Sequence, residues 1–197
     1  MLNLFNKTLP AVLLSLVLHG CASYRAPDLS DTIAQQDDWL LRGKLGVITP
    51  DERLSANLHW RHLGRSGQDD LRLTNPFGGT VLSLSAQPGL ANVTLDGQHY
   101  SGSSAEQLIR RLTGWQLPLS QLSAYLLGDP GNNPSTVYDA DGNPLSLTLI
   151  HPQSGESWLL TYQGWQQLSG YKVPRQLELR QNGQRIKLAI SFWQPEP

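Results

Sequence analysis

Apolar and polar residues alternate along most of the chain from residue 39 onward. In the segment 39–48 the odd positions Trp39, Leu41, Leu45 and Val47 are apolar, while Arg42 and Lys44 lie on the other parity. Neighbouring side chains of a β-strand point to opposite faces, so this alternation predicts a strand with one dry face. Further strands of this kind are predicted at 54–60, 71–73, 82–86, 91–95, 98–101, 145–149, 158–162, 177–179 and 185–193. Such alternation is typical of an antiparallel sheet.

Between residues 103 and 128 the apolar positions follow a helical period instead. Ser103 and Glu106 have capping-box spacing at the start of a first helix, and Gly114 fits the position just after its end. A second helix is predicted after Pro118, with Ser120 as its cap. The apolar stripes of these helices, which could form a lid over one mouth of the sheet, contain Leu108, Ile109, Leu112, Leu122 and Leu126. The predicted order is six strands, two helices, and four or five strands.

This pattern sets the fold class as mainly β, in a single domain of residues 38–197. A strongly curved antiparallel sheet of this size tends to close or nearly close, because closure leaves no bare edges. A barrel of about eight strands is filled by its own side chains or holds one small ligand, whereas a larger one would leave an apolar cavity. A flattened sandwich with a filled core is the alternative that the pattern leaves open.

The N-terminus has the features of a secretory signal. Lys7 precedes an apolar run at 9–18, which is too short for a membrane-spanning helix of about 20 residues. The run leads to Gly20-Cys21, and the chain has no other cysteine. This ending resembles a bacterial lipobox, which implies a signal peptide at 1–20 and lipidation of Cys21. A buried free thiol in a cytosolic protein is the alternative.

Residues 21–37 are expected to form a polar tether with a short helix around 30–36. The residue after Cys21 is Ala22, whereas in bacterial lipoproteins an Asp at this place marks retention in the inner membrane. The resemblance therefore implies a lipid anchor in the outer membrane.

Composition and motifs argue against several function classes. The net charge is −1, so the chain has no basic field for binding nucleic acid. His59 and His62 lie three apart on one predicted strand, so they point to opposite faces and cannot share a metal ion. They are interpreted as solvated, as are His99 and His151, and Asp69 is interpreted as a turn residue. The chain contains no metal, cofactor or catalytic motif, so no enzyme is predicted, although a carboxylate pair assembled by folding stays open.

One turn contains a residue that turn chemistry does not explain. The segment Asn75–Gly79 has the turn formers Asn, Pro and Gly, but its Phe77 would hold an aromatic ring out in water. The alternative is that the ring folds back onto the rim of the sheet.

Three stretches of the chain resemble the LolB family of outer-membrane lipoprotein receptors. They are LTNPFGGTVLSLSAQPG at 73–89, LTGWQLPLSQLSAYLLGDPG at 112–131 and GQRIKLAI at 183–190. The resemblance implies an unclosed antiparallel β-barrel of about eleven strands, with an apolar cavity under a helical lid. It also implies a monomer that accepts lipoproteins from the carrier LolA by their acyl chains. The protein would face the periplasm and insert lipoproteins among the phospholipids of the inner leaflet of the outer membrane, without ATP.

The resemblance also implies sites. A hydrophobic residue on a protruding loop serves membrane insertion in the family, and its place is taken here by Phe77, supported by Pro76, Gly78 and Gly79. The acyl-binding cavity would be lined by residues on the apolar parity of the strands: Leu41, Leu45, Leu58, Trp60, Leu73, Leu82, Leu84, Val93, Leu147, Trp158, Leu160 and Leu188. A structural outer-membrane lipoprotein with a filled core and no transfer activity is the alternative.

Overall fold

The structure is a computed structural model that describes residues 38–151 and 155–196. The predicted signal peptide at 1–20, Cys21, and the predicted tether and helix at 21–37 lie outside the described residues.

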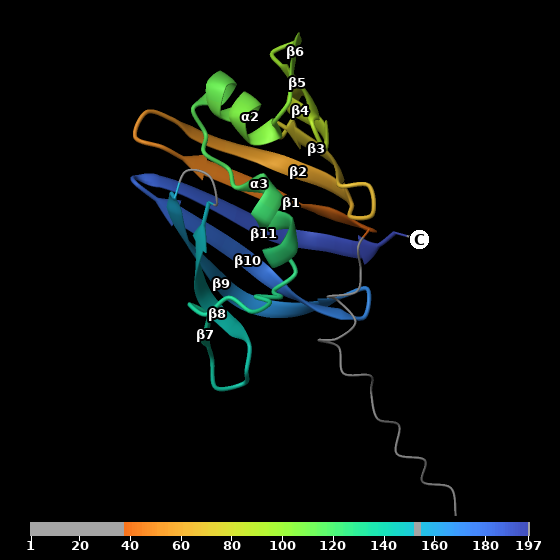
Figure 1. Cartoon of the computed structure of the whole chain (residues 1–197). Coiled ribbons are helices and arrows are strands. Elements are labelled where there is room, and N and C mark those ends of the chain that lie inside the picture. The colour runs from red at the N-terminus through yellow and green to blue at the C-terminus, as the bar shows by residue number, and fades with distance from the viewer. Residues whose placement is uncertain (1–37, 152–154, 197) are drawn as a thin grey trace, which may run out of the picture.

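All strands belong to one antiparallel sheet with the order β6-β5-β4-β3-β2-β1-β11-β10-β9-β8-β7 (Figure 1). Their bounds are β1 Asp38–Ile48, β2 Arg53–Leu63, β3 Gln68–Thr74, β4 Thr80–Gln87, β5 Leu90–Leu95, β6 Gln98–Gly102, β7 Val137–Tyr138, β8 Pro144–Ile150, β9 Ser157–Leu168, β10 Tyr171–Gln181 and β11 Gln184–Pro195. The first and last strands pair in the middle, whereas β6 and β7 are edges that do not pair with each other. The mainly β, unclosed antiparallel architecture of eleven strands is therefore confirmed. The sequence predicted four or five strands after the helices. The fifth is β7, whose 2 residues are too few to show a period.

The pairing register places the apolar side chains of neighbouring strands on the same face of the sheet. β1 and β2 pair with Leu41 opposite Trp60, and β2 and β3 pair with Leu58 opposite Leu73. These side chains lie together in a single hydrophobic cluster. Arg42, on the other parity of β1, is exposed. The alternation in the sequence therefore corresponds to an apolar concave face and a polar convex face.

The central pair of strands, β1 and β11, leaves no room for a side chain at Gly43. The β1–β11 register shifts between Arg42 and Gly43, which marks a bulge. A Cβ atom at Gly43 would lie 2.1 Å from the carbonyl oxygen of Ala189, so a side chain does not fit there. A bulge bends its strand and increases the local twist, and here it helps the sheet curve around its apolar face.

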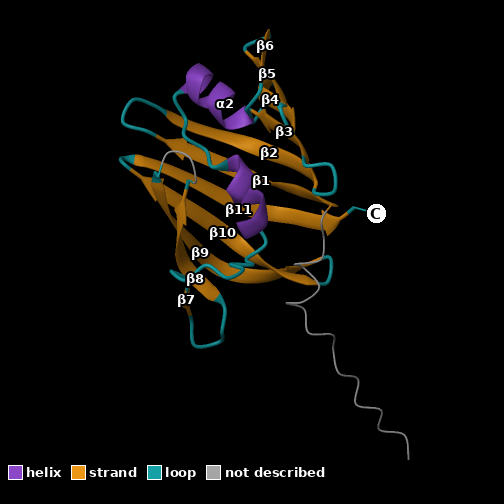
Figure 2. Ribbon diagram, viewed as in Figure 1, coloured by secondary structure: helices purple, strands orange, loops and turns teal. Residues whose placement is uncertain are grey.

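Two helices lie across the concave face (Figures 1 and 2). In α2 (Ala105–Thr113) the cap is Ser104, whose hydroxyl oxygen accepts a hydrogen bond from the backbone N–H of Gln107 at 3.4 Å. The predicted cap, Ser103, is therefore wrong by one residue. The helix ends as predicted at Gly114, which has a left-handed conformation with φ 73°.

The second helix, α3 (Leu119–Tyr125), begins after Pro118 without a side-chain cap, so the predicted cap at Ser120 is wrong. At its other end, the hydroxyl of Tyr162 in β9 donates a hydrogen bond to the carbonyl oxygen of Tyr125 at 3.0 Å. Burial raises the pKa of Tyr162, so the phenol keeps its proton at neutral pH and stays a donor. This bond ties the end of α3 to the sheet.

One carboxylate joins both helices to the opposite side of the sheet. Glu106 in α2 accepts hydrogen bonds from the backbone N–H of Ser120 at 2.9 Å and from its hydroxyl at 2.8 Å. The other carboxylate oxygen of Glu106 lies 3.1 Å from Nε2 of His151, which follows β8. Glu106 is therefore not the capping partner that its spacing predicts, and His151, with 21% of its side chain exposed, is not simply solvated.

The position of this carboxylate in the topology explains its importance. α2 packs against β5 and β6, at one edge of the sheet, whereas β8 pairs with β7 at the other edge. The hydrogen bonds of Glu106 therefore connect segments from the two sides of the open sheet, across its concave face.

The register can be tested with one charge placed on either face of β2. Leu58→Glu would put a carboxylate at a position that is 4% exposed, at a cost of several kcal/mol unless it is paired. We expect a large loss of stability in urea unfolding. Asn57→Glu, one residue away on the exposed face, should change the free energy of unfolding by no more than about 0.5 kcal/mol. Equal effects at the two positions would show that the register is wrong by one residue.

The bridge at Glu106 can be tested by removing its carboxylate. Glu106→Ala takes away the acceptor of three hydrogen bonds and should lower the free energy of unfolding by about 1–3 kcal/mol. Hydrogen exchange of residues 105–125 should become faster, while exchange in β1 and β11 stays slow. Asp51→Ala, which removes an exposed carboxylate from the turn after β1, is the matched control. Unchanged exchange of both helices in Glu106→Ala would mean that apolar packing alone holds the lid.

Candidate functional site

The residues predicted to line the acyl cavity lie together on the concave face. Each is at most 8% exposed and belongs to the same hydrophobic cluster: Leu41, Leu45, Leu58, Trp60, Leu73, Leu82, Leu84, Val93, Leu147, Trp158, Leu160 and Leu188. The predicted lid residues join them from the helices: Leu108, Ile109, Leu122 and Leu126 are buried in the cluster, and Leu112 is partly buried against it. The structure thus brings wall and lid into contact, and the lid side chains fill much of the concave space.

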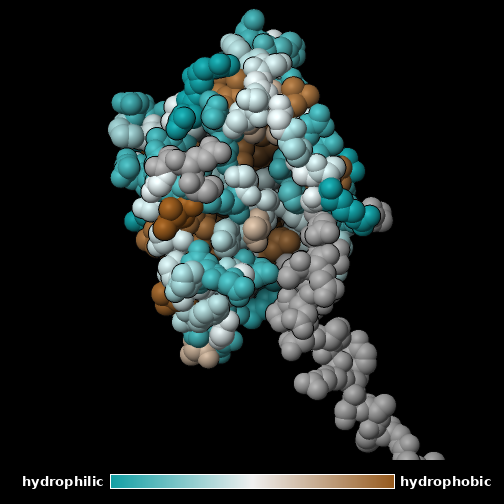
Figure 3. Space-filling model, in the orientation of Figure 1, coloured by the Kyte–Doolittle hydropathy of each residue, from teal (hydrophilic) through white to brown (hydrophobic). Residues whose placement is uncertain are grey.

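A pocket remains between the start of α2 and the strands β2 to β4. It has a volume of about 360 Å³, and its apolar wall includes Trp60, Leu71, Leu84 and Leu119. Figure 3 shows hydrophobic side chains, in brown, at the bottom of hollows in this face of the molecule. The volume is at the low end of the range for small-molecule sites, about 300–1,000 Å³.

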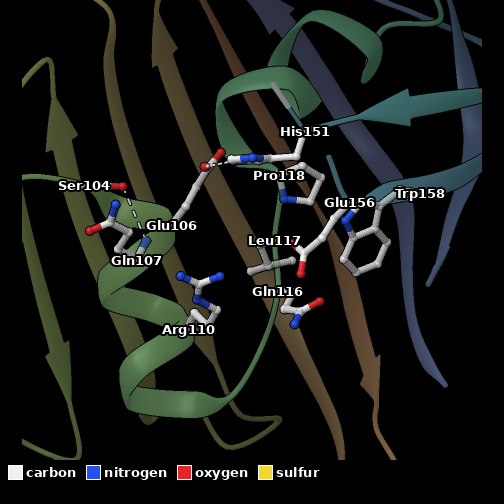
Figure 4. Close-up of a pocket in the computed structure, with 10 residues that line it drawn as sticks. All are labelled: Ser104, Glu106, Gln107, Arg110, Gln116, Leu117, Pro118, His151, Glu156 and Trp158. Carbon is white, nitrogen blue, oxygen red and sulfur yellow. Dashed lines mark hydrogen bonds and ion pairs between the residues drawn. The ribbon is translucent and has the colours of Figure 1, made fainter. Parts of the chain in front are cut away.

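A second, more polar pocket also has Glu106 in its lining (Figure 4). Its volume is about 220 Å³, and it is lined by Gln107, Arg110, Gln116 and Trp158, among others. The two pockets share four lining residues: Ser104, Glu106, Gln107 and His151. An apolar and a polar pocket therefore lie next to each other, and Glu106, whose carboxylate holds the lid, lines both of them.

A buried polar contact orients one wall of the apolar pocket. The indole N–H of Trp60 donates a hydrogen bond to Asp69 at 2.7 Å, and Nδ1 of His62 lies 2.8 Å from the same carboxylate oxygen. The ring of His62 packs against Trp39, with ring centres 5.1 Å apart. Trp60 is 2% exposed, so its N–H needs a partner inside the protein. Asp69 supplies that partner and fixes the indole ring.

The interpretation of Asp69 as a turn residue and of His62 as solvated is therefore wrong. Asp69 lies within β3 and pairs with His62 across the β2–β3 register. Strand parity contained the signal, because Asp69 has the parity of the inward Leu71, and His62 has the parity of the inward Trp60. His59, on the other parity, is exposed as interpreted.

The hairpin between β3 and β4 holds Phe77 out in solvent, with 97% of the residue exposed. The side-chain oxygen of Asn75 accepts hydrogen bonds from the backbone N–H of Phe77 at 2.9 Å and of Gly79 at 3.0 Å. Gly78 has φ 88°, a left-handed conformation that favours glycine. The turn is therefore a compact support for an exposed ring, and the ring does not fold back onto the rim.

This hairpin lies far along the sheet from the point where the described chain begins. Asp38 pairs with Leu63, and Leu63 pairs with Gln68 at the start of β3. Phe77 follows Thr74, at the other end of the same strand. The start of β1 and the Phe77 hairpin are therefore at opposite ends of β3.

Within the described residues, none of the helices has the length and apolar character needed to cross a membrane. In the same part of the chain, no three His, Cys, Asp or Glu side chains come together in an arrangement that could hold a metal ion.

Comparison with known proteins gives a consistent result. A family model described as outer membrane lipoprotein LolB matches residues 37–193. The outer-membrane lipoprotein LolB of Shewanella denitrificans is 36% identical over 96% of this chain and 95% of its own length. The outer-membrane lipoprotein LolB of Shewanella loihica is 37% identical over 98% of this chain and 91% of its own length.

Solved structures show the same fold at low sequence identity. A LolA superfamily protein from Nitrosomonas europaea aligns with a TM-score of 0.56 at 14% identity, over 83% of this chain and 88% of its own. A putative outer membrane lipoprotein-sorting protein domain from Vibrio parahaemolyticus aligns with a TM-score of 0.50 at 10% identity, over 84% of this chain and 90% of its own. The family match over residues 37–193 and the near full-length relatives at 36–37% identity show that the chain belongs to the LolB family of outer membrane lipoproteins.

Proposed function

We propose that this protein is a lipid-anchored receptor that takes lipoproteins from the carrier LolA and inserts them into the inner leaflet of the outer membrane. The observation that carries the proposal is the apolar concave face of an open sheet covered by two short helices. The twelve predicted wall residues all lie on that face. Membership of the LolB family, whose relatives are named as outer-membrane lipoproteins, supports the location.

Acyl chains suit this face because their binding needs only apolar burial. Each buried CH₂ group contributes about 0.8 kcal/mol, so several long chains bind tightly without a specific polar contact. The pocket of about 360 Å³ is at the low end of the range for a drug-sized ligand. The helices must therefore move outward, and acyl chains replace Leu108, Leu122 and Leu126 against the wall.

Transfer requires no ATP in this scheme. A lipoprotein passes from LolA to the receptor if the receptor binds its acyl chains more tightly, and a tenfold preference needs only about 1.4 kcal/mol. The bilayer then accepts the chains from the receptor. The receptor itself is held by the lipid chains on Cys21, since two or more chains anchor a protein stably.

Phe77 acts at the last step. Full burial of a Phe side chain contributes about 1.5–3 kcal/mol, which is too little to anchor the protein but enough to orient it. The exposed ring enters the apolar layer and brings the receptor against the membrane that receives the lipoprotein.

A second candidate function is that of a structural lipoprotein with a filled core. The lid leucines that occupy the concave space favour it, since a permanently filled interior leaves no room for acyl chains. Ligand acceptance separates the two functions.

The decisive test is transfer in solution. Mature chain with Cys21→Ser, purified without the signal peptide, should take a lipoprotein from a LolA–lipoprotein complex, because the binding face lies entirely within the described fold. Separation of the two proteins by affinity tag then shows which one holds the lipoprotein. A lipoprotein that stays on LolA would contradict the receptor function and support the structural alternative.

Phe77 is tested by splitting the reaction into two steps: transfer from LolA to the receptor, then from the receptor to liposomes. Phe77→Glu should leave the first step intact, because a change at an exposed position usually alters stability by no more than about 0.5 kcal/mol. It should impair the second step, because a carboxylate does not enter the apolar layer cheaply. Phe77→Leu, which keeps an apolar tip, is the control and should deliver normally. Failure of Phe77→Glu in the first step would place Phe77 in the contact with LolA instead.

A further inference from the structure

The polar pocket next to the lid contains hydrogen-bond donors that the fold does not use. The side chains of Gln107, Arg110 and Gln116 line its opening (Figure 4). Among the described residues, none of these three side chains has a hydrogen-bond or ion-pair partner, although Arg110 carries a full positive charge. The donors come from α2 and from the segment that links α2 to α3.

The backbone of the linking segment is held in place by the sheet. The buried side chain of Gln184, at the start of β11, accepts a hydrogen bond from the N–H of Gln116 at 3.2 Å and donates one to its carbonyl oxygen at 3.5 Å. These bonds use the backbone of Gln116 and leave its side-chain amide available. The fold therefore fixes the backbone from which one of the three donors extends.

The charges around the pocket limit the groups that it can bind. The carboxylates of Glu106 and Glu156 line it together with the guanidinium of Arg110 and the ring of His151, which pairs with Glu106. A phosphate would lie against two carboxylates, and Arg110 is the lining side chain that carries a permanent positive charge, so like-charge contacts disfavour such a ligand. Neutral carbonyl oxygens, which accept hydrogen bonds without bringing charge, fit the donors better.

We infer that this pocket binds the polar linkage of an acylated lipoprotein, namely the ester and amide carbonyl groups that join the acyl chains to its N-terminal cysteine. The inference rests on the proposed function, in which the acyl chains occupy the adjacent apolar face. The shared boundary at Glu106 puts the two parts of such a ligand into neighbouring pockets. The arrangement selects acylated protein over the phospholipid that surrounds an outer-membrane receptor, because phospholipid has similar chains but carries a phosphate.

The test compares three probes on the mature Cys21→Ser chain. They are a synthetic peptide with a tripalmitoylated S-glyceryl cysteine, a phosphatidylglycerol with the same acyl chains, and the apolar dye N-phenylnaphthylamine. The unaltered protein should bind the acylated peptide more tightly than the phosphatidylglycerol. Arg110→Ala should weaken peptide binding by about 10- to 150-fold, which is the range for a lost hydrogen bond to a charged group. Dye binding should not change, which also shows that the variant is folded.

Arg111→Ala is the matched control, because Arg111 is the next cation along α2, is exposed, and does not line the pocket. It should leave the affinities for all three probes unchanged. Equal losses in Arg110→Ala and Arg111→Ala would overturn the inference in favour of a general charge effect. Full peptide affinity in Arg110→Ala, or equal affinity of the unaltered protein for peptide and phosphatidylglycerol, would overturn it while leaving the proposed function intact. Failure of the unaltered protein to bind any acylated probe would overturn both.

Discussion

Burial of the apolar concave face is the interaction on which the rest of the structure depends. Because the sheet is open between β6 and β7, this face would otherwise expose its apolar side chains as one continuous patch, which soluble proteins rarely do. α2 and α3 cover it with their leucine and isoleucine side chains. A small set of polar contacts then fixes their positions, chiefly the hydrogen bonds of Glu106 and Tyr162.

The two kinds of contact have different consequences. Apolar burial is non-directional, so the wall can exchange lid leucines for any other chain of CH₂ groups with little loss. The hydrogen bonds are directional, few and worth only about 0.5–1.5 kcal/mol each in net terms. A cover held in this way is stable when nothing else is present, yet an apolar ligand can displace it. In the proposed receptor, the same leucines serve as temporary substitutes for the cargo.

Strand parity was enough to predict much of this architecture from the sequence. It identified the wall residues, for example Leu58 and Leu160, because burial on one face imposes a period of two residues that local sequence shows directly. The exposed Phe77 was also predictable, since the flanking turn formers leave its ring without a core to join. The short β7 was not, because two residues carry no period.

Contacts that depend on register or tertiary structure were harder to predict. Ser103 and Ser104 are both residues that can cap a helix, and the backbone path into α2 determines that Ser104 takes the N-cap position. Glu106 has the spacing of a capping partner, but its carboxylate instead binds Ser120 and His151, the latter 45 residues away. Such a contact cannot be predicted from local sequence. The inward position of Asp69 could have been predicted. Asp69 has the same strand parity as the inward Leu71, so applying the alternation to polar residues as well would have placed its side chain on the inner face.

The separation of Asp38 and Phe77 along β3 has a mechanical consequence. The 7 residues of β3 span roughly 20 Å at about 3.3 Å per residue, so a rigid attachment at the start of β1 would hold the ring well away from the bilayer. The stretch from Cys21 to Asp38 can reach at most about 60 Å if fully extended. That reach exceeds the length of the strand, so the proposed anchor at Cys21 is compatible with contact between the ring and the bilayer. In the proposed receptor, the anchor would keep the protein close to one membrane, and the ring at the hairpin tip would set the orientation in which cargo leaves.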